Sequence, residues 1–309
     1  MAKILIIGNS AAGFSCAQNL AKNLLNHEIT VISQDAYPAY KRDLLIDYLK
    51  GSVGEHELFL ENQGSSKNIT LILNSKVTSV DPKKKRVILK DNSKINFDYL
   101  VIASGQEQSI PDIPGKTKDG IFTTSNMEDI KTIKERMITT GTICIIGDTA
   151  LCLRLWEALS LKEAKEIKII SSAKPDSFVA SQNSEWLQDL KIIEFIGEGS
   201  ELKAIKLNNG KIIGASLVLF AGNYSPATQF LKDSGVQVEN GYITVNELMQ
   251  TNFENIFACG SVVKNTNLTE MDKEKTWDQA TREGALAAEN IITLLGKENI
   301  SCQQNSWSS

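Results

Sequence analysis

The sequence contains 309 residues, with ordinary hydrophobic and charged fractions of 42% and 23% and a formal net charge of −4. This length predicts two domains, and the slight negative charge excludes a general affinity for nucleic acid. No apolar run approaches the length of a membrane span, and the first residues do not resemble a secretory signal. The five cysteines are odd in number and scattered, so we expect reduced thiols in a cytoplasmic protein.

The first 32 residues predict a strand, a glycine turn, a helix and a second strand. Residues 3–7 form a short aliphatic run that ends at Gly8, as expected for a strand buried on both faces of a parallel sheet. Apolar residues then recur at helical spacing over residues 14–25, and a second aliphatic run covers residues 29–32. The free N–H groups at the start of such a helix suit a diphosphate ligand.

The turn itself reads Gly8-x-Ser10-x-x-Gly13 and differs from the usual dinucleotide fingerprint G-x-G-x-x-G only in its second glycine. Gly8 provides the tight turn and Gly13 allows the helix to pack closely on the strand. Ser10 stands where the backbone approaches a pyrophosphate, and its small side chain can donate a hydrogen bond to phosphate. A glycine-rich turn alone is weak evidence, but its place directly after a buried strand favours a nucleotide site.

Residues 33–110 predict short strands and turns. The second strand ends in Ser33, Gln34 and Asp35, where a nucleotide site normally carries an acidic residue for the ribose. Arg42 stands in a turn that leads into a short helix, either as a solvated charge or as a phosphate ligand. Strands are expected at residues 69–73, 77–80, 86–89 and 99–103, with the basic run 83–86 at a solvated hairpin tip.

The pattern of strand, turn, helix and strand occurs a second time. It comprises a strand over residues 142–146, a turn from Gly147 to Cys152, a helix to about residue 161 and a strand over residues 167–170. The repeat indicates duplicated nucleotide-binding domains. Further strands are expected at residues 192–196, 202–207, 211–213 and 217–220. A closing helix over about 277–295 and a loose polar tail over 299–309 complete the chain.

Several motifs, in this order, resemble those of the FAD-dependent pyridine nucleotide–disulfide oxidoreductase superfamily over nearly the whole chain. They are the Gly8 turn, Ala103-Ser104-Gly105, the second turn, Tyr224-Ser225-Pro226 and the stretch from Thr251 to Ser261. Residues 38–45 resemble a motif of NADH:rubredoxin reductases and of the flavoprotein part of assimilatory nitrite reductases. The closing helix is also similar to theirs, through Trp277, Ala280, Gly284, Ala287 and Ala288.

The resemblance implies an α/β fold with two Rossmann-like, three-layer nucleotide-binding domains, the second inserted in the first, as in glutathione reductase. Residues 1–110 plus 235–309 would bind FAD, and residues 111–234 would form the inserted NAD(P)H-type domain with a degenerate motif.

The resemblance also implies which residues bind FAD. The pyrophosphate would contact Gly8, Ser10, Ala11, Ala12 and Gly13, and the adenosine ribose would lie near Ser33 and Gln34. Val77 would offer backbone groups to adenine, Arg42 would lie by the pyrophosphate or flavin, and Ala103, Ser104 and Gly105 would pass over the cofactor. Gly260 and Ser261 occupy the family's Gly-Asp motif, so the serine would bond the ribityl chain without the strength of a charged partner.

Departures from the family pattern shape the expected function. Residues 40–48 contain no cysteine where disulfide reductases carry a redox thiol, so thiol redox chemistry is not expected. Many relatives dimerise through a further C-terminal domain, and we expect it to be missing here. In the second turn, Thr149 and Cys152 replace glycines, and Ser171 replaces the acidic ribose ligand. These three changes predict that NAD(P)H binds poorly or not at all. The alternative is that the fold has adjusted around these residues and still binds it, as the first turn tolerates Ser10.

These observations predict an FAD-dependent oxidoreductase that transfers electrons between its flavin and a small redox partner, an iron–sulfur protein of the rubredoxin or ferredoxin kind. No side chain stands out as a catalytic acid or base, and no metal site is expected. The alternative is a flavin-binding electron-relay subunit, or a pseudoenzyme, within a larger complex.

Overall fold

The computed structural model describes residues 1–61, 67–138, 141–161, 166–180, 183–264 and 275–306, with side chains up to residue 297. These residues form two compact units. The first comprises Met1–Lys41, Phe59–Gln106 and Pro226–Ser309, and the second comprises Arg42–Leu58 and Glu107–Ser225. Each unit contains a five-stranded parallel sheet with helices, which confirms the predicted α/β class. The predicted domain bounds stay a prediction.

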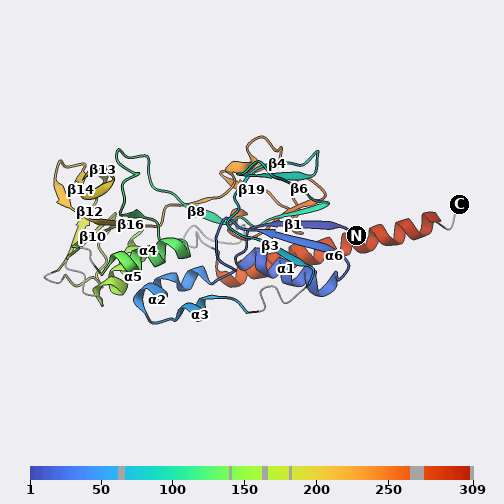
Figure 1. Ribbon diagram of the computed structural model, residues 1–309, viewed down its shortest axis with the longest axis horizontal. Coiled ribbons are helices and arrows are strands. Elements are labelled where there is room, and N and C mark those ends of the chain that lie inside the picture. Colours follow the sequence, from blue (N-terminus) through green and yellow to red (C-terminus); the bar gives the residue numbers. More distant parts are fainter. Residues whose placement is uncertain (62–66, 139–140, 162–165, 181–182, 265–274, 307–309) are drawn as a thin grey trace. The chain divides into compact units, whose positions relative to one another are not determined.

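The first unit is built on a parallel sheet in the order β20-β7-β1-β2-β3 (Figure 1). Its strands are β1 (Lys3–Ile7), β2 (Glu28–Ile32), β3 (Ile69–Ile72), β7 (Tyr99–Ile102) and β20 (Ile256–Ala258). Successive residues of β1 point to opposite faces, so Ile4 and Ile6 join one hydrophobic core while Leu5 and Ile7 join another. The Gly8 turn therefore begins at the carboxyl end of the central strand.

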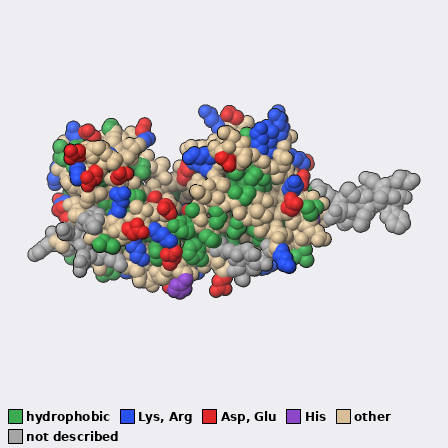
Figure 2. All heavy atoms as spheres, in the orientation of Figure 1, with side chains coloured by type: hydrophobic (Ala, Val, Ile, Leu, Met, Phe, Trp, Pro, Cys, Tyr) green, Lys and Arg blue, Asp and Glu red, His purple; other side chains and the backbone are tan. Residues whose placement is uncertain are grey.

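Two helices from opposite ends of the chain, α1 (Ala11–Asn23) and α6 (Trp277–Ser306), pack against each other on one face of this sheet (Figure 1). The other face packs against an antiparallel sheet of β4 (Val77–Asp81), β5 (Arg86–Leu89) and β6 (Lys94–Asn96). The basic run lies at the β4–β5 turn, where Lys83, Lys84 and Lys85 are exposed, as predicted for a hairpin tip. Figure 2 shows basic side chains gathered above this part of the molecule.

The second unit has its own parallel sheet in the order β12-β11-β10-β16-β9. Its strands are β9 (Ile121–Phe122), β10 (Thr142–Gly147), β11 (Glu166–Ser171), β12 (Ser184–Gln188) and β16 (Leu217–Ala221). The helix α5 (Thr149–Ser160) packs on β10, β11 and β16, and α2 (Leu45–Lys50) packs on α5. The opposite face carries an antiparallel sheet of β13 (Ile192–Glu198), β14 (Glu201–Leu207) and β15 (Ile212–Gly214).

The remaining elements are short. They are α3 (Glu55–Leu58), α4 (Met127–Arg136), β8 (Gln106–Gln108), β17 (Tyr224–Pro226), β18 (Val238–Glu239), β19 (Tyr242–Ile243) and the 3-10 turns η1 (Arg42–Leu44), η2 (Gln229–Leu231) and η3 (Gly260–Val262). None of the described helices is long and apolar enough to cross a bilayer. The predicted loose tail is wrong up to Ser306, because α6 continues through a stretch that contains no proline and no glycine after Gly296.

Candidate FAD site and the second nucleotide turn

The turn after β1 requires glycine at both of its predicted positions. Gly8 has a φ of +108°, and a Cβ there would lie 2.1 Å from the carbonyl oxygen of Ala103. A Cβ on Gly13 would lie 2.0 Å from the carbonyl oxygen of Gly8. The amide of Gly8 also donates to Ile32 O at 2.8 Å, which joins the turn to the end of β2. These contacts pack the start of α1 directly against the strand.

The amino end of α1 has the features of an anion site. Ser10 is the N-cap residue with extended backbone, and its side chain does not cap the helix. The amides of Ala11, Ala12 and Gly13 have no partner within the helix and carry the positive end of its dipole. The buried side-chain nitrogen of Asn9 has no hydrogen-bond partner among the described residues. A buried donor without a partner is costly, so a bound phosphate oxygen fits this turn well.

Residues from the far end of the chain lie against the same turn of α1. A Cβ on Gly260, where φ is +79°, would lie 2.9 Å from the Cβ of Ala12. A Cβ on Gly284 would lie 2.1 Å from Ala12 O, so α6 approaches the α1 backbone at this glycine. The structure thus brings Gly260 and Ser261 beside the Gly8 turn, and the arrangement fits FAD.

The stretch Ala103-Ser104-Gly105 borders the turn at its first residue. The amide of Ala103 donates to Ile7 O at 2.8 Å and continues the pairing of β7 with β1. The Ser104 hydroxyl donates to Ala227 O at 2.8 Å, and Gly105 has a φ of +68° with open space around a Cβ. Ala103 therefore contacts the Gly8 turn, whereas Ser104 is fixed by a neighbouring loop.

The residues predicted near adenosine lie in the same unit. Ser33 follows β2 and is buried, and its hydroxyl oxygen accepts the Asp35 amide at 3.1 Å. The hydroxyl proton remains available to a ribose oxygen. Gln34 is exposed, and the side chain of Val77, the first residue of β4, is buried. The roles of these three residues toward FAD stay predictions.

Arg42 belongs to the second unit rather than to the unit that carries the Gly8 turn. It begins η1, its side chain is exposed, and its Nη1 donates to Ser125 O at 2.7 Å. Its predicted role beside FAD stays a prediction.

The second turn differs from the first at its helix. Gly147 retains its need for glycine, since a Cβ would lie 1.7 Å from Ala221 O. Asp148 is the N-cap of α5, and its Oδ1 accepts the amides of Ala150 and Leu151 at 2.9 and 3.2 Å. A carboxylate of this chain thus takes the two donors and the dipole end that a pyrophosphate would use.

The position predicted to hold a nicotinamide-nucleotide ribose is also hydrogen-bonded within the chain. The Ser171 hydroxyl donates to Ala173 O at 2.7 Å and accepts from Trp186 Nε1 at 3.0 Å. The Thr149 hydroxyl lies 3.3 Å from both Ser171 Oγ and Ala173 O. A hydroxyl has one proton, and that of Ser171 is already bonded to Ala173 O. Phe178 packs edge-on against Trp186 at a centroid distance of 4.9 Å and helps to fix that indole.

The four thiols with described side chains, Cys16, Cys144, Cys152 and Cys259, are buried and free. Burial raises the pKa of each, to about 12 for Cys152 and Cys259, where nearby carboxylates add to the effect. The nucleophilic thiolate form is therefore suppressed in these four residues. The expectation that the thiols take no part in redox chemistry stays a prediction. Cys302 lies outside the residues whose side chains are described.

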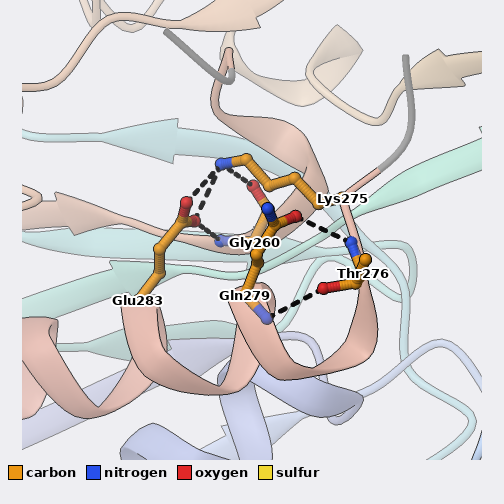
Figure 3. Close-up of polar contacts among 5 residues, drawn as sticks. All are labelled: Gly260, Lys275, Thr276, Gln279 and Glu283. Atoms are coloured by element: carbon orange, nitrogen blue, oxygen red, sulfur yellow. Dashed lines mark hydrogen bonds and ion pairs between the residues drawn. The ribbon is translucent and has the colours of Figure 1, made fainter. Parts of the chain in front are cut away.

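Lys275 and Glu283 meet the backbone of Gly260 at the start of α6 (Figure 3). The sequence reasoning missed this pair, and it also missed the Asn9 amide, the Asp148 cap and the Trp186 bond. Thr276 and Gln279, three residues apart, were a readable signal for the start of the helix, because they bond each other's amides as a capping box. The contact with Gly260 had no local signal.

A model of the family "Pyridine nucleotide-disulphide oxidoreductase" matches residues 2–284. The chain is 26% identical to the NADH oxidase of Methanocaldococcus jannaschii, over 96% of this chain and 71% of that protein. It is 29% identical to the NADH-rubredoxin oxidoreductase of Clostridium acetobutylicum, over 85% and 68% respectively. Human apoptosis-inducing factor 3 is 24% identical, with 94% of this chain matching half of that protein.

Solved structures show the same fold. The covalent putidaredoxin reductase–putidaredoxin complex matches 94% of this chain and 75% of its counterpart, with a TM-score of 0.81 and 18% identity. The NAD-dependent persulfide reductase from A. fulgidus matches 94% and 59%, with a TM-score of 0.80 and 23% identity. The chain thus spans about half to three quarters of the length of these relatives. Many of their names include NADH or NAD, so they do not bear out the expectation of poor NAD(P)H binding.

The family match covers most of the sequence, and the Gly8 turn, Gly260 and Gly284 meet at one place in the fold. The chain belongs to the pyridine nucleotide-disulphide oxidoreductase family, a family of FAD-binding oxidoreductases.

Proposed function

We propose that this protein is an FAD-dependent oxidoreductase that passes electrons between its flavin and a small iron–sulfur carrier of the rubredoxin or ferredoxin kind. The observation that carries the proposal is the amino end of α1, whose uncapped amides and unpartnered Asn9 lie beside Gly260 and Ser261. The similarity to the NADH-rubredoxin oxidoreductase and to the ferredoxin–NAD(+) reductase components of two dioxygenase systems, 24% and 26% identical, supports the choice of partner.

In this proposal Ala11, Ala12, Gly13 and Asn9 donate to the FAD pyrophosphate, and Ser261 bonds the ribityl chain. FAD, when bound, supplies a group that accepts and releases one or two electrons, while the protein supplies binding and orientation. The buried thiols take no part, because burial keeps them protonated.

The purified protein is expected to be yellow and to release FAD on heating in a near one-to-one ratio. Added FAD should raise the melting temperature of the apoprotein in proportion to the logarithm of its concentration. Mixing the dithionite-reduced protein with oxidised rubredoxin or ferredoxin should reoxidise the flavin. A colourless protein whose melting temperature does not respond to FAD would contradict the proposal.

We further propose that the second unit binds NAD(P)H weakly. Asp148 accepts the α5 amides, the Ser171 proton is bonded to Ala173 O, and Cys152 is completely buried where the family has glycine. All three features weaken the binding of the same ligand, NAD(P)H, so together they should reduce its affinity at least about a hundredfold. The names of the relatives support the use of NADH, whereas the geometry of this turn supports weak binding.

Stopped-flow reduction of the bound FAD by NADH and by NADPH tests weak binding. The rate should rise linearly with nucleotide up to millimolar concentrations, without saturation. Rapid, saturable reduction at micromolar concentrations would refute it and would leave an ordinary NAD(P)H-dependent reductase.

The self-capped second turn also favours a second candidate, an electron-relay subunit of a larger complex. Such a subunit would exchange electrons with two protein partners and would show no turnover with any pyridine nucleotide. Steady-state assays with NADH, NADPH and each iron–sulfur carrier distinguish the two functions.

A further inference from the structure

A buried lysine lies immediately before α6. The side chain of Lys275 is only 4% exposed, which is rare for lysine unless it is paired. Its Nζ lies 2.7 and 2.8 Å from the two carboxylate oxygens of Glu283 and donates to Gly260 O at 3.1 Å. Figure 3 shows the ammonium group directed at both partners.

Glu283 completes the contact from the other side. Its Oε2 accepts the amide of Gly260 at 2.8 Å, so both backbone polar groups of this glycine bond to the same ion pair. The Gly260 carbonyl also accepts the Val263 amide at 3.0 Å, which closes η3. Gly260 has a φ of +79° and lies against Ala12. The pair therefore holds the residue that precedes Ser261 in one orientation beside α1.

Helix stability does not explain this lysine. The capping box of Thr276 and Gln279 already satisfies the start of α6, and a positive charge near a helix amino terminus opposes the dipole. A buried ion pair is also weak evidence for stability, since desolvation offsets the attraction. A role in orienting Gly260 accounts for both the position and the burial of Lys275.

We propose that Lys275 and Glu283 are positioning residues that clamp Gly260 so that Ser261 meets bound FAD, and that Lys275 keeps the Glu283 carboxylate compensated beside the anionic cofactor. This inference rests on the proposed FAD function and assigns to Lys275, just before α6, and to Glu283, within α6, a task that the Gly260-Ser261 motif does not perform alone. Lys275 donates to the Gly260 carbonyl and Glu283 accepts the Gly260 amide, so the clamp requires a donor at position 275 and an acceptor at position 283.

Affinity for FAD in the reconstituted apoprotein, measured by quenching of flavin fluorescence, tests the clamp. Lys275→Met leaves the carboxylate uncompensated, and Glu283→Leu removes the acceptor of the Gly260 amide. Each should weaken FAD binding about tenfold to a hundredfold. Glu283→Gln keeps an acceptor and should stay within about threefold of the unaltered protein. Lys84→Met, which removes the lysine of an exposed pair on the β4–β5 hairpin, is the control and should have no effect.

The exchange Lys275→Glu with Glu283→Lys separates the clamp from a simple ion pair. It preserves both charges, but a carboxylate cannot donate to Gly260 O and an ammonium cannot accept its amide. FAD affinity should therefore remain as low as in Lys275→Met, with circular dichroism and the apoprotein melting temperature confirming folding. If Lys275→Met does not fold, Glu283→Gln and Glu283→Leu carry the comparison, because both keep Lys275.

Two results would overturn the clamp: restored FAD affinity in the exchanged variant, or equal affinities in Glu283→Gln and Glu283→Leu. If the unaltered protein bound no FAD, the proposed function would fail and this inference would fail with it. If it bound FAD and the variants matched it, only the clamp would fail.

Discussion

Single glycines decide how closely the elements of the first unit approach one another. Gly284 lies within α6, where alanine is normally preferred, yet a Cβ there would lie 2.1 Å from Ala12 O. Gly296 in the same helix has open space around a Cβ. The two residues share a helix and differ in their surroundings, so the contact with α1, rather than helix propensity, explains Gly284.

We expect Gly284→Ala to lower the free energy of unfolding by about 1–3 kcal/mol, because the added methyl group forces α6 away from α1. Gly296→Ala should raise it by up to about 1 kcal/mol, because the alanine improves helix propensity without a clash. Urea unfolding of the apoprotein compares the two. If Gly284→Ala instead raised the free energy of unfolding, the close contact between α1 and α6 would not be needed for stability.

The buried thiols predict a loss of stability in alkaline solution. Burial raises the pKa of Cys152 and Cys259 to about 12 in the folded chain, whereas an unfolded thiol titrates near about 8.5. The folded state therefore holds more protons above about pH 8.5. The stability from these thiols is fully present below that pH and is lost as the pH rises toward about 12.

Urea unfolding between pH 7.5 and 10 measures this loss, with a slope of up to about 1.4 kcal/mol per pH unit for each thiol. Cys152→Ala should reduce the slope, although the cavity lowers stability at every pH. An unchanged slope in Cys152→Ala would argue against a raised pKa at this residue.

At the scale of elements, two helices that follow the central strands of two similar sheets present different amino ends. The end of α1 has no side-chain cap, whereas Asp148 caps that of α5. Gly147 still packs against β16, so the fold of the turn survives although its anion site is occupied by the chain itself. The second turn therefore keeps the backbone geometry of a nucleotide-binding turn without keeping free amides for a phosphate.

Asp148→Gly should improve NADH affinity about tenfold, because it removes a like charge and releases the amides of Ala150 and Leu151. Asp148→Asn keeps a capping side chain and should gain less. Asp112→Asn, in an exposed pair of the same unit, is the control for net charge. Titration of NADH fluorescence measures the affinities, and no gain in Asp148→Gly would mean that Asp148 does not limit binding.

Strands with local hydrophobic patterns were predictable from the sequence, including β5 at its observed bounds and β10 within one residue. The helix α4 was missed because only Met127, Ile130 and Ile133 of its ten residues are buried, which leaves a sparse apolar pattern. The strand β12 was missed because Leu187 is its only buried residue. The strand is fixed by its pairing with β11, which local sequence does not specify.

At the scale of the whole molecule, the candidate site also combines features that a local sequence pattern predicts with contacts that only the folded chain shows. The glycine positions of the first turn were readable because they are spaced along one segment. The contacts of Ala12 with Gly260 and Gly284, and of Ser171 with Trp186, join residues distant in sequence, and the pattern of either segment alone does not specify them. A family resemblance supplied the order of motifs but not these bonds.

The two units, each with its own sheet and core, should respond separately to ligands. We expect FAD to slow amide hydrogen exchange at the Gly8 turn, α1 and residues 256–261, since binding stabilises the segments that contact it. NADH at micromolar concentration should leave exchange in α5 unchanged. Protection of α5 by NADH would contradict weak binding in the second unit, and absence of protection by FAD at α1 would contradict the first site.

The meeting of Ala12 with Gly260 and Gly284 has a consequence for how the protein is made. A ribosome synthesises the Gly8 turn first and α6 last, so the first turn is complete long before its facing surface exists. A nascent chain that stops before residue 260 lacks both Gly260 and α6, and one that stops before residue 284 still lacks the part of α6 that contacts Ala12. Cofactor loading must therefore follow synthesis of both ends, and prematurely terminated chains would accumulate without flavin and with one face of α1 exposed to water.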